Sequence, residues 1–356
     1  MAADEHGKIA LTWKTCLPSI GFGIGGALLI AASALYGELV HGYGLLRKED
    51  PDFTPFGRAR IVVSFVAALL FFAALKPFSR GPAEDEAIAR GAGLGAIGSA
   101  LIFLLAVAAA VHFVPTSLND YVREMQPLGI ATEFLLLAAI ALLLLAARRA
   151  LSSNAPRLLG LLSPSWVLAG MAAVVFLILM EEMSWGQHWL GWATPDLFRD
   201  NIQNETNIHN FYTYQFEAIY YTSAILCFVV LPWCWPRGTG GIAGQVALYV
   251  PPRVFALLAL PIASLMYESW NIVPYQVWFF LSLMIGVDIV CRLASRELRN
   301  AAIALALVYA GTKLVFLFRG SAMVDGYELS EVREFYIALL FMIHGWMLAG
   351  RFRQHP

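Results

Sequence analysis

Residues 176–212 read FLILMEEMSWGQHWLGWATPDLFRDNIQNETNIHNFY, and the rest of the chain is organised around them. An apolar run ends here at two adjacent glutamates, Glu181 and Glu182. Three tryptophans, a proline and a segment crowded with amides then precede the next apolar run. An apolar run that stops at charged residues, followed by tryptophans, is typical of a helix leaving a lipid bilayer. We therefore expect a membrane protein whose polar side chains concentrate in this stretch.

The composition of the whole chain agrees with that expectation. Of 356 residues, 59% are hydrophobic and 14% are charged, and the mean hydropathy is +0.66. A soluble domain carries about 25% charged residues. The formal net charge of −1 argues against a nucleic-acid partner. We predict one integral membrane domain that covers residues 1–356.

Ten apolar runs have the length that crosses a hydrocarbon core about 30 Å thick. Each should be a helix, because a lipid-exposed segment must satisfy its own backbone hydrogen bonds. The expected fold is therefore an all-α, polytopic transmembrane helical bundle. The predicted spans are residues 17–40, 59–77, 91–114, 128–147, 164–184, 214–232, 252–269, 272–291, 300–318 and 333–350.

The orientation in the membrane follows from the basic residues between the spans. With ten spans, one side collects 15 Lys and Arg residues and the other collects 8. The positive-inside rule then puts both termini in the cytoplasm and residues 181–213 outside. We expect the cytoplasmic (inner) membrane of a bacterium. The N-terminus loosely resembles a signal peptide, but Asp4, Glu5 and the length of the apolar run favour an uncleaved first span.

Residues 181–192 would present two faces if the fifth span continued as a helix beyond the bilayer. Glu181, Ser184 and His188 would share the inward face. The three tryptophans, at positions 185, 189 and 192, would share another face and lie in the interfacial belt. Between residues 201 and 210 nearly every side chain is polar, and on a helix Glu205 would meet His209 one turn later.

These acids and imidazoles suggest chemistry. Two adjacent carboxylates near lipid do not both ionise unless a cation compensates them. A mixed set of carboxylate and imidazole ligands suits a divalent metal such as Zn, Mn or Fe that keeps an open water position. The expected metal ligands are Glu182, His188, Glu205 and His209. Without a metal, one glutamate would act as the acid or base, with Lys313 as a counter-charge.

The predicted site has two parts. The catalytic residues are the metal ligands together with Glu181. The substrate-binding residues are the polar and aromatic side chains of the same stretch and two residues from later external ends, namely Ser184, Trp185, Gln187, Asn201, Gln203, Asn207, Asn210, Glu268 and Lys313.

The order of these residues resembles that of a bacterial family of polytopic membrane proteins. Its members carry a similar EE-x-SWGQ … TP … NxQxETNxHN block, which matches residues 181–210 of this chain. A shorter element, Glu205-x-Asn207-x-His209, resembles the Glu-x-x-Asn…His element found in some alkaline ceramidases and adiponectin-type receptors. That second resemblance implies a membrane hydrolase with a zinc site, although this sequence has no HxxxH pair.

Three classes of function remain open. The first is a membrane enzyme that hydrolyses or transfers a group of a lipid or lipid-linked substrate at the outer face. A polyprenyl-phosphate-dependent glycosyltransferase is a variant of it, with its base near Glu49 and Asp50. The second is a lipid transporter or flippase, and the third is a non-catalytic assembly subunit. The oligomeric state is left open. We expect membrane lipid as a partner in each case.

Overall fold

The computed structural model describes residues 13–46, 48–79, 90–123, 125–236 and 240–353, without the side chains of residues 13–16 and 90. The basis of the uncleaved first span lies partly in residues 1–12, outside the described residues. Two compact units divide the chain. Unit 1 combines residues 1–109 with 225–321, and unit 2 combines residues 110–224 with 322–356.

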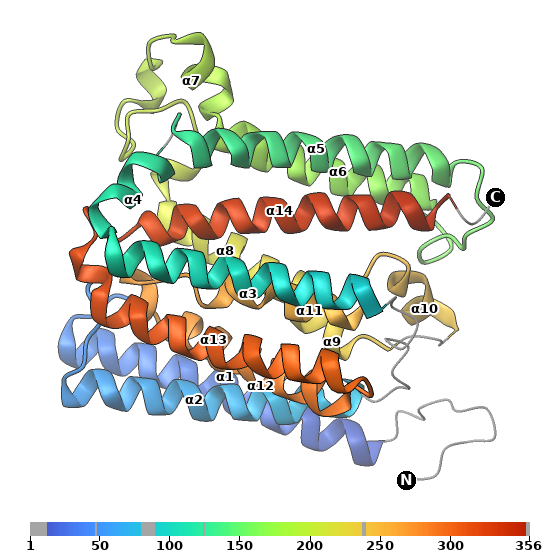
Figure 1. Ribbon diagram of the computed structural model, residues 1–356, viewed down its shortest axis with the longest axis horizontal. Helices are drawn as coiled ribbons and strands as arrows, with labels where there is room; N and C mark the ends of the chain where they lie inside the picture. The colour runs from blue at the N-terminus through green and yellow to red at the C-terminus, as the bar shows by residue number, and fades with distance from the viewer. Residues whose placement is uncertain (1–12, 47, 80–89, 124, 237–239, 354–356) are drawn as a thin grey trace. The chain divides into compact units, whose positions relative to one another are not determined.

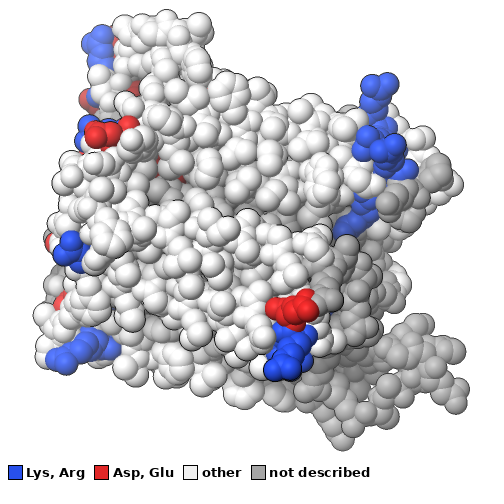
Figure 2. Space-filling model, in the orientation of Figure 1, with Lys and Arg blue, Asp and Glu red and all other residues white. Residues whose placement is uncertain are grey.

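The structure confirms an all-α, multi-pass membrane protein. In the described residues, nine helices are long and apolar enough to cross a bilayer. Figure 2 shows the charged side chains of the visible face near the ends of the helices, with uncharged surface along their flanks. That distribution suits helices surrounded by lipid, because a charge within the hydrocarbon core is costly.

Unit 1 is built around α12 (Val273–Arg292), which packs against α2 and α13. In the most apolar stretch of α12, 67% of the residues are buried, whereas 11% are buried in the corresponding stretch of α1. The outer helices therefore leave most of their surface to lipid. The other helices of this unit are α1 (Trp13–His41), α2 (Pro55–Leu75), most of α3 (Arg90–Phe113), α9 (Leu231–Cys234), α10 (Gly241–Ala247), α11 (Arg253–Ala259) and α13 (Arg296–Arg319).

One predicted span of unit 1, residues 252–269, is wrong as a continuous helix. α11 passes into a short 3-10 helix at Leu260–Ala263, and the backbone is then irregular up to a second 3-10 helix at Glu268–Asn271. Pro261 explains the break, because proline lacks the N–H that a helix needs and its ring clashes with the preceding turn. We call residues 253–271 the broken crossing.

The broken crossing nevertheless traverses the unit from end to end. At its start, Arg253 Nη2 donates to the carbonyl of Ser79 (3.0 Å), just beyond α2. At its end, Asn271 Nδ2 donates to the carbonyl of Asp50 (2.7 Å), just before α2. It therefore runs antiparallel to α2 over the same thickness. Irregular backbone at this depth is tolerated because nearly all of it is buried in protein.

Unit 2 is a bundle in which α5 (Pro127–Ala150) lies between α6 (Pro164–Glu182) and α14 (Glu328–Arg351) in the contact pattern (Figure 1). α14 approaches α5 closely at Gly345, where an added Cβ would lie 3.2 Å from Leu142 Cβ and 3.3 Å from the carbonyl of Ala139. Small residues allow such close packing in lipid. The unit also contains α4 (Pro115–Val122) and α8 (Thr213–Ile225).

Residues 184–212, here called the 184–212 segment, join α6 to α8. They contain only short helices, namely a 3-10 turn at Ser184–Gly186, α7 (Gln187–Leu190), and 3-10 turns at Asp196–Phe198 and His209–Phe211. All residues of the segment are described.

Candidate functional site

The chain turns sharply where α6 ends. Ser184, Trp185 and Gly186 have φ angles of 46°, 57° and 95°, all in the left-handed region that side chains disfavour. The helix therefore does not continue, and the expected common helical face of residues 181, 184 and 188 is wrong. Non-glycine residues in this region cost roughly 1–3 kcal/mol each and cluster at functional sites. Two such residues in a row indicate a conformation imposed by the contacts around them.

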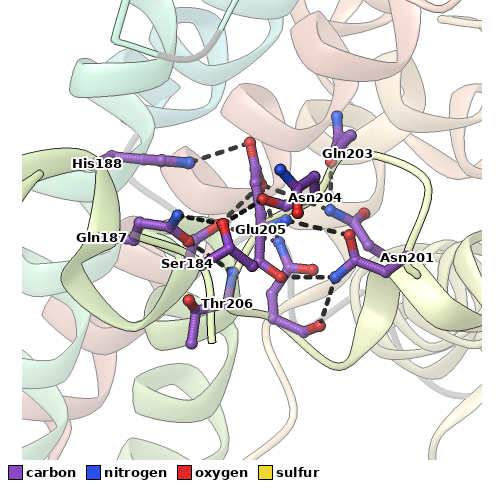
Figure 3. Close-up of polar contacts among 11 residues, drawn as sticks. Ser184, Gln187, His188, Asn201, Gln203, Asn204, Glu205 and Thr206 are labelled. Atoms are coloured by element: carbon purple, nitrogen blue, oxygen red, sulfur yellow. Dashed lines mark hydrogen bonds and ion pairs between the residues drawn. The ribbon is translucent and has the colours of Figure 1, made fainter. Parts of the chain in front are cut away.

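The carboxylate of Glu205 is the centre of those contacts (Figure 3). Its Oε2 accepts hydrogen bonds from Ser184 Oγ (2.8 Å) and from the side-chain amides of Asn207 (3.0 Å) and Asn210 (3.4 Å). Its Oε1 lies 3.2 Å from Nε2 of His188. Ser184, Asn207 and Asn210 are buried. The Glu205 carboxylate thus links Ser184, at the start of the 184–212 segment, to Asn210, near its end.

Two amide side chains hold the backbone around Glu205. Asn201 accepts from the Glu205 N–H (3.1 Å) and donates to the Glu205 carbonyl (2.6 Å). Gln187 accepts from the Thr206 N–H (2.6 Å) and donates to Thr194 Oγ1 (2.9 Å). The position of the Glu205 carboxylate is therefore fixed from both sides by side chains that the sequence analysis assigned to the site.

A second acid–imidazole pair lies at the end of α6. Glu181 Oε2 accepts from the backbone N–H groups of Ile208 (2.8 Å) and His209 (2.9 Å), and it lies 3.3 Å from His209 Nδ1. Its Oε1 accepts from Trp185 Nε1 (2.8 Å). The expected helical pairing of Glu205 with His209 is wrong, because residues 201–207 form turns and Glu205 faces His188 instead.

These pairings do not assemble the expected metal ligands. Throughout the described part of the chain, no three His, Cys, Asp or Glu side chains are grouped so that they could hold a metal ion. His188 pairs with Glu205 and His209 pairs with Glu181, whereas Glu182 is the last residue of α6. The residues present therefore do not fit the expected Zn, Mn or Fe site.

Two buried polar atoms near Glu205 have no partner among the described residues, namely Asn207 Oδ1 and Thr206 Oγ1. The Asn207 side chain is 1% exposed, and its amide nitrogen bridges Ser184 and Glu205. An unpaired buried acceptor costs about 1–3 kcal/mol. A water or a substrate hydroxyl that donates to Asn207 Oδ1 would remove that cost.

The remaining predicted residue of the segment, Gln203, accepts a hydrogen bond from the Asn210 side-chain amide. The structure adds Glu133 of α5, a residue that sequence reasoning did not place in the site. Trp189 Nε1 donates to Glu133 Oε2 of α5 at 2.7 Å, and Glu133 is buried. An acid inside an apolar span was the signal for it.

Glu268 and Lys313, also predicted site residues, belong to unit 1. Lys313 Nζ donates to the carbonyl of Met266 (2.8 Å) in the broken crossing and lies 4.9 Å from the centre of the Trp270 ring. The Glu268 carbonyl accepts from the Glu49 N–H (3.1 Å). The acidic loop favoured by the glycosyltransferase variant, with Glu49 and Asp50, therefore packs on the end of the broken crossing.

The structure thus brings together most of the polar side chains predicted from residues 181–210. They lie in unit 2, around two acid–imidazole pairs, Glu205 with His188 and Glu181 with His209. Their functional roles stay predictions. Comparison of this chain with models of protein families, with curated proteins and with solved structures finds no match.

Proposed function

We propose that this chain is an integral membrane enzyme that hydrolyses, or transfers a group from, a lipid or lipid-linked substrate without a metal. The Glu181–His209 pair is the observation that carries the proposal. Because Nδ1 of His209 faces the carboxylate, the second ring nitrogen, Nε2, lies on the other side of the ring. The side chain is 28% exposed, so a reactant can reach it.

A carboxylate that accepts from Nδ1–H selects the imidazole tautomer with a basic Nε2. His209 Nε2 then takes a proton from a water or a substrate hydroxyl, and the oxygen attacks an ester, amide or phosphoester centre. The bond to the leaving group breaks, and the imidazolium returns the proton to it. Glu181 stabilises the charged imidazole during this step, and three N–H donors hold Glu181 in place.

The Glu205 network has a supporting role in this proposal. It fixes the strained turn that directly follows Glu181 and the end of α6. The position of the pair at the end of a membrane span, α6, supports a lipid as the proposed substrate. The count of basic residues supports an orientation in which this end faces the outside, and the membrane we propose is the inner membrane of a bacterium.

The test is a lipid-turnover assay on the full chain in nanodiscs made from a total polar lipid extract of bacteria. Mass spectrometry follows every lipid class over time. The wild type should consume one class and release its headgroup or acyl chain. His209→Ala and Glu181→Gln should lower that rate by about 100-fold to 10,000-fold, the usual contribution of a general base. Glu182→Ala tests the neighbouring acid in the same assay.

Arg199→Ala is the matched control, because Arg199 lies in the same segment and its side chain is 66% exposed. It should leave the rate unchanged. Turnover at the wild-type rate in both His209→Ala and Glu181→Gln, or no turnover by the wild type of any class, would overturn the proposed enzyme.

A second candidate, a lipid transporter, is favoured by the broken crossing. Discontinuous membrane helices often surround the binding sites of transporters. Its test is the movement of a fluorescent phospholipid between leaflets of liposomes that contain the purified chain. Leaflet exchange that depends on the protein and survives Glu181→Gln would favour transport over the enzyme.

A further inference from the structure

The 184–212 segment has a polar interior and an apolar exterior. Its buried side chains include Ser184, Asn201, Asn207 and Asn210, whereas none of its hydrophobic side chains is buried. Leu190, Leu197 and Ile202 are 74%, 79% and 73% exposed. A segment that faces water shows the reverse distribution, because burying apolar surface is the main driving force of folding. The surroundings of this segment must therefore be apolar.

A contact with α5 gives the depth of the segment. Trp189 donates to Glu133, which is six residues after the first residue of α5, Pro127. At 1.5 Å per residue, Glu133 lies about 9 Å along the helix from its beginning. Trp189 of the segment therefore reaches the flank of α5, below the first turn of that helix.

Figure 1 shows the same placement within unit 2. The loop that carries α7 extends away from α5 at right angles to the helix axes, at the end where α5 begins and α6 ends. A segment beside the flank of a membrane helix, near its end, lies at the level where headgroups meet acyl chains. The last turns of α6, which precede the segment, also expose apolar side chains, at Phe176 and Leu177.

The aromatic and charged side chains of the segment suit that level. Trp185 and Trp189 donate their indole N–H groups to glutamates and leave their rings partly exposed, as in the aromatic belts of membrane proteins. Asp196 and Arg199 pair with each other and have highly exposed side chains. In Figure 2 the charged side chains of this part of the molecule gather at its left edge, on the side where these helices end.

We propose that the 184–212 segment lies in the interfacial layer of the bilayer, with Leu190 and Ile202 in contact with lipid acyl chains. The lipid surface is thus the partner that covers its apolar exterior, and the Glu205 network is its sheltered polar interior. This proposal does not depend on the proposed chemistry, and it holds for an enzyme, a transporter or an assembly subunit.

The test is spin labelling of the full chain in liposomes, after replacement of Cys16, Cys227, Cys234 and Cys291 by Ala. Single cysteines are introduced as Leu190→Cys, Ile202→Cys and, as the matched control, Asp196→Cys. The measurement compares how strongly two reagents relax each label. Oxygen concentrates in lipid, whereas the water-soluble complex NiEDDA stays outside it. Labels at positions 190 and 202 should respond to oxygen, and the label at position 196 should respond to NiEDDA.

All three positions are exposed, so the labels should leave the fold intact, and an unchanged gel-filtration profile checks this. Labels at positions 190 and 202 that respond to NiEDDA like position 196 would show a surface in water and overturn the proposal. Labels shielded from both reagents would show that a protein, either a partner or a second copy of this chain, covers the surface, and would overturn it equally.

Discussion

Lys313 of α13 reaches the carbonyl of Met266 in the broken crossing, with 2.8 Å between Nζ and the oxygen, and its side chain is fully buried. Where the helix is interrupted, backbone carbonyls lose their helical partners. The Lys313 ammonium supplies a donor to one of them and lies near the rings of Trp270 and Phe279. A long side chain from a neighbouring helix therefore supports the irregular backbone.

Lys313→Ala should lower the free energy of unfolding by about 2–5 kcal/mol, because it leaves a cavity and an unpaired buried carbonyl. Leu314→Ala is the matched control, since Leu314 is adjacent and 56% exposed. It should cost less than about 1 kcal/mol, as expected for a surface position. Denaturant unfolding in detergent measures both, and equal stability of the two variants would contradict the role of Lys313.

Replacing Glu205 should loosen the 184–212 segment. In Glu205→Ala the donors of Ser184, Asn207 and Asn210 lose their shared acceptor, at about 1–3 kcal/mol for each that stays buried and unpaired. Hydrogen exchange of residues 184–212 should then accelerate at least tenfold, while α5 and α14 keep their protection. Asp196→Ala, at an exposed position, is the control. Unchanged exchange in Glu205→Ala would mean that other contacts hold the segment.

The bond between Trp189 and Glu133 can be measured by a double-mutant cycle. Trp189→Phe removes the indole donor, Glu133→Gln removes the charge of the acceptor, and the pair should couple by about 1–3 kcal/mol. Unfolding of the two single variants and the double variant in detergent gives the coupling. A coupling close to zero would show that the 184–212 segment is not attached to α5 through this bond.

Adding one methyl group at the contact of α14 with α5 should destabilise the protein. Gly345→Ala would put Cβ against Leu142 and the carbonyl of Ala139, and overpacking of this kind costs about 1–3 kcal/mol. Gly350→Ala, five residues later in the same helix, meets nothing within 4 Å and is the matched control. The thermal midpoint should fall only in Gly345→Ala. Equal midpoints would show that the two helices can separate without loss.

Sequence reasoning predicted the membrane class and most spans because hydrophobic composition is summed over about twenty residues and tolerates local error. It failed at residues 252–269, where composition is apolar throughout and a single proline, Pro261, ends the helix. Hydropathy indicates whether the side chains of a segment are apolar enough for lipid, but it does not indicate the conformation of the backbone. The proline was the available signal, although proline also occurs within continuous membrane helices.

The sequence indicated which polar side chains lie near one another, but it did not indicate which of them pair. Polar side chains in an otherwise apolar chain marked the stretch, and Glu205, His188, Glu181 and His209 do lie in it. The predicted pairings rested on helical spacing, which the left-handed turn at Ser184–Gly186 and the turns at residues 201–207 remove. Only Gly186 hinted at that turn, because glycine tolerates positive φ. Contacts across twenty residues of irregular chain cannot be derived from spacing alone.

The interruption at Pro261 also affects how the chain is counted by topology methods. A count of uninterrupted spans in the described residues gives nine, an odd number, and would assign the start of α1 and the end of α14 to opposite compartments. Including residues 253–271 makes the number even. A reporter enzyme fused after residue 353 should therefore lie on the same side of the membrane as one fused before residue 13. A reporter fused directly after residue 271 should lie on the opposite side.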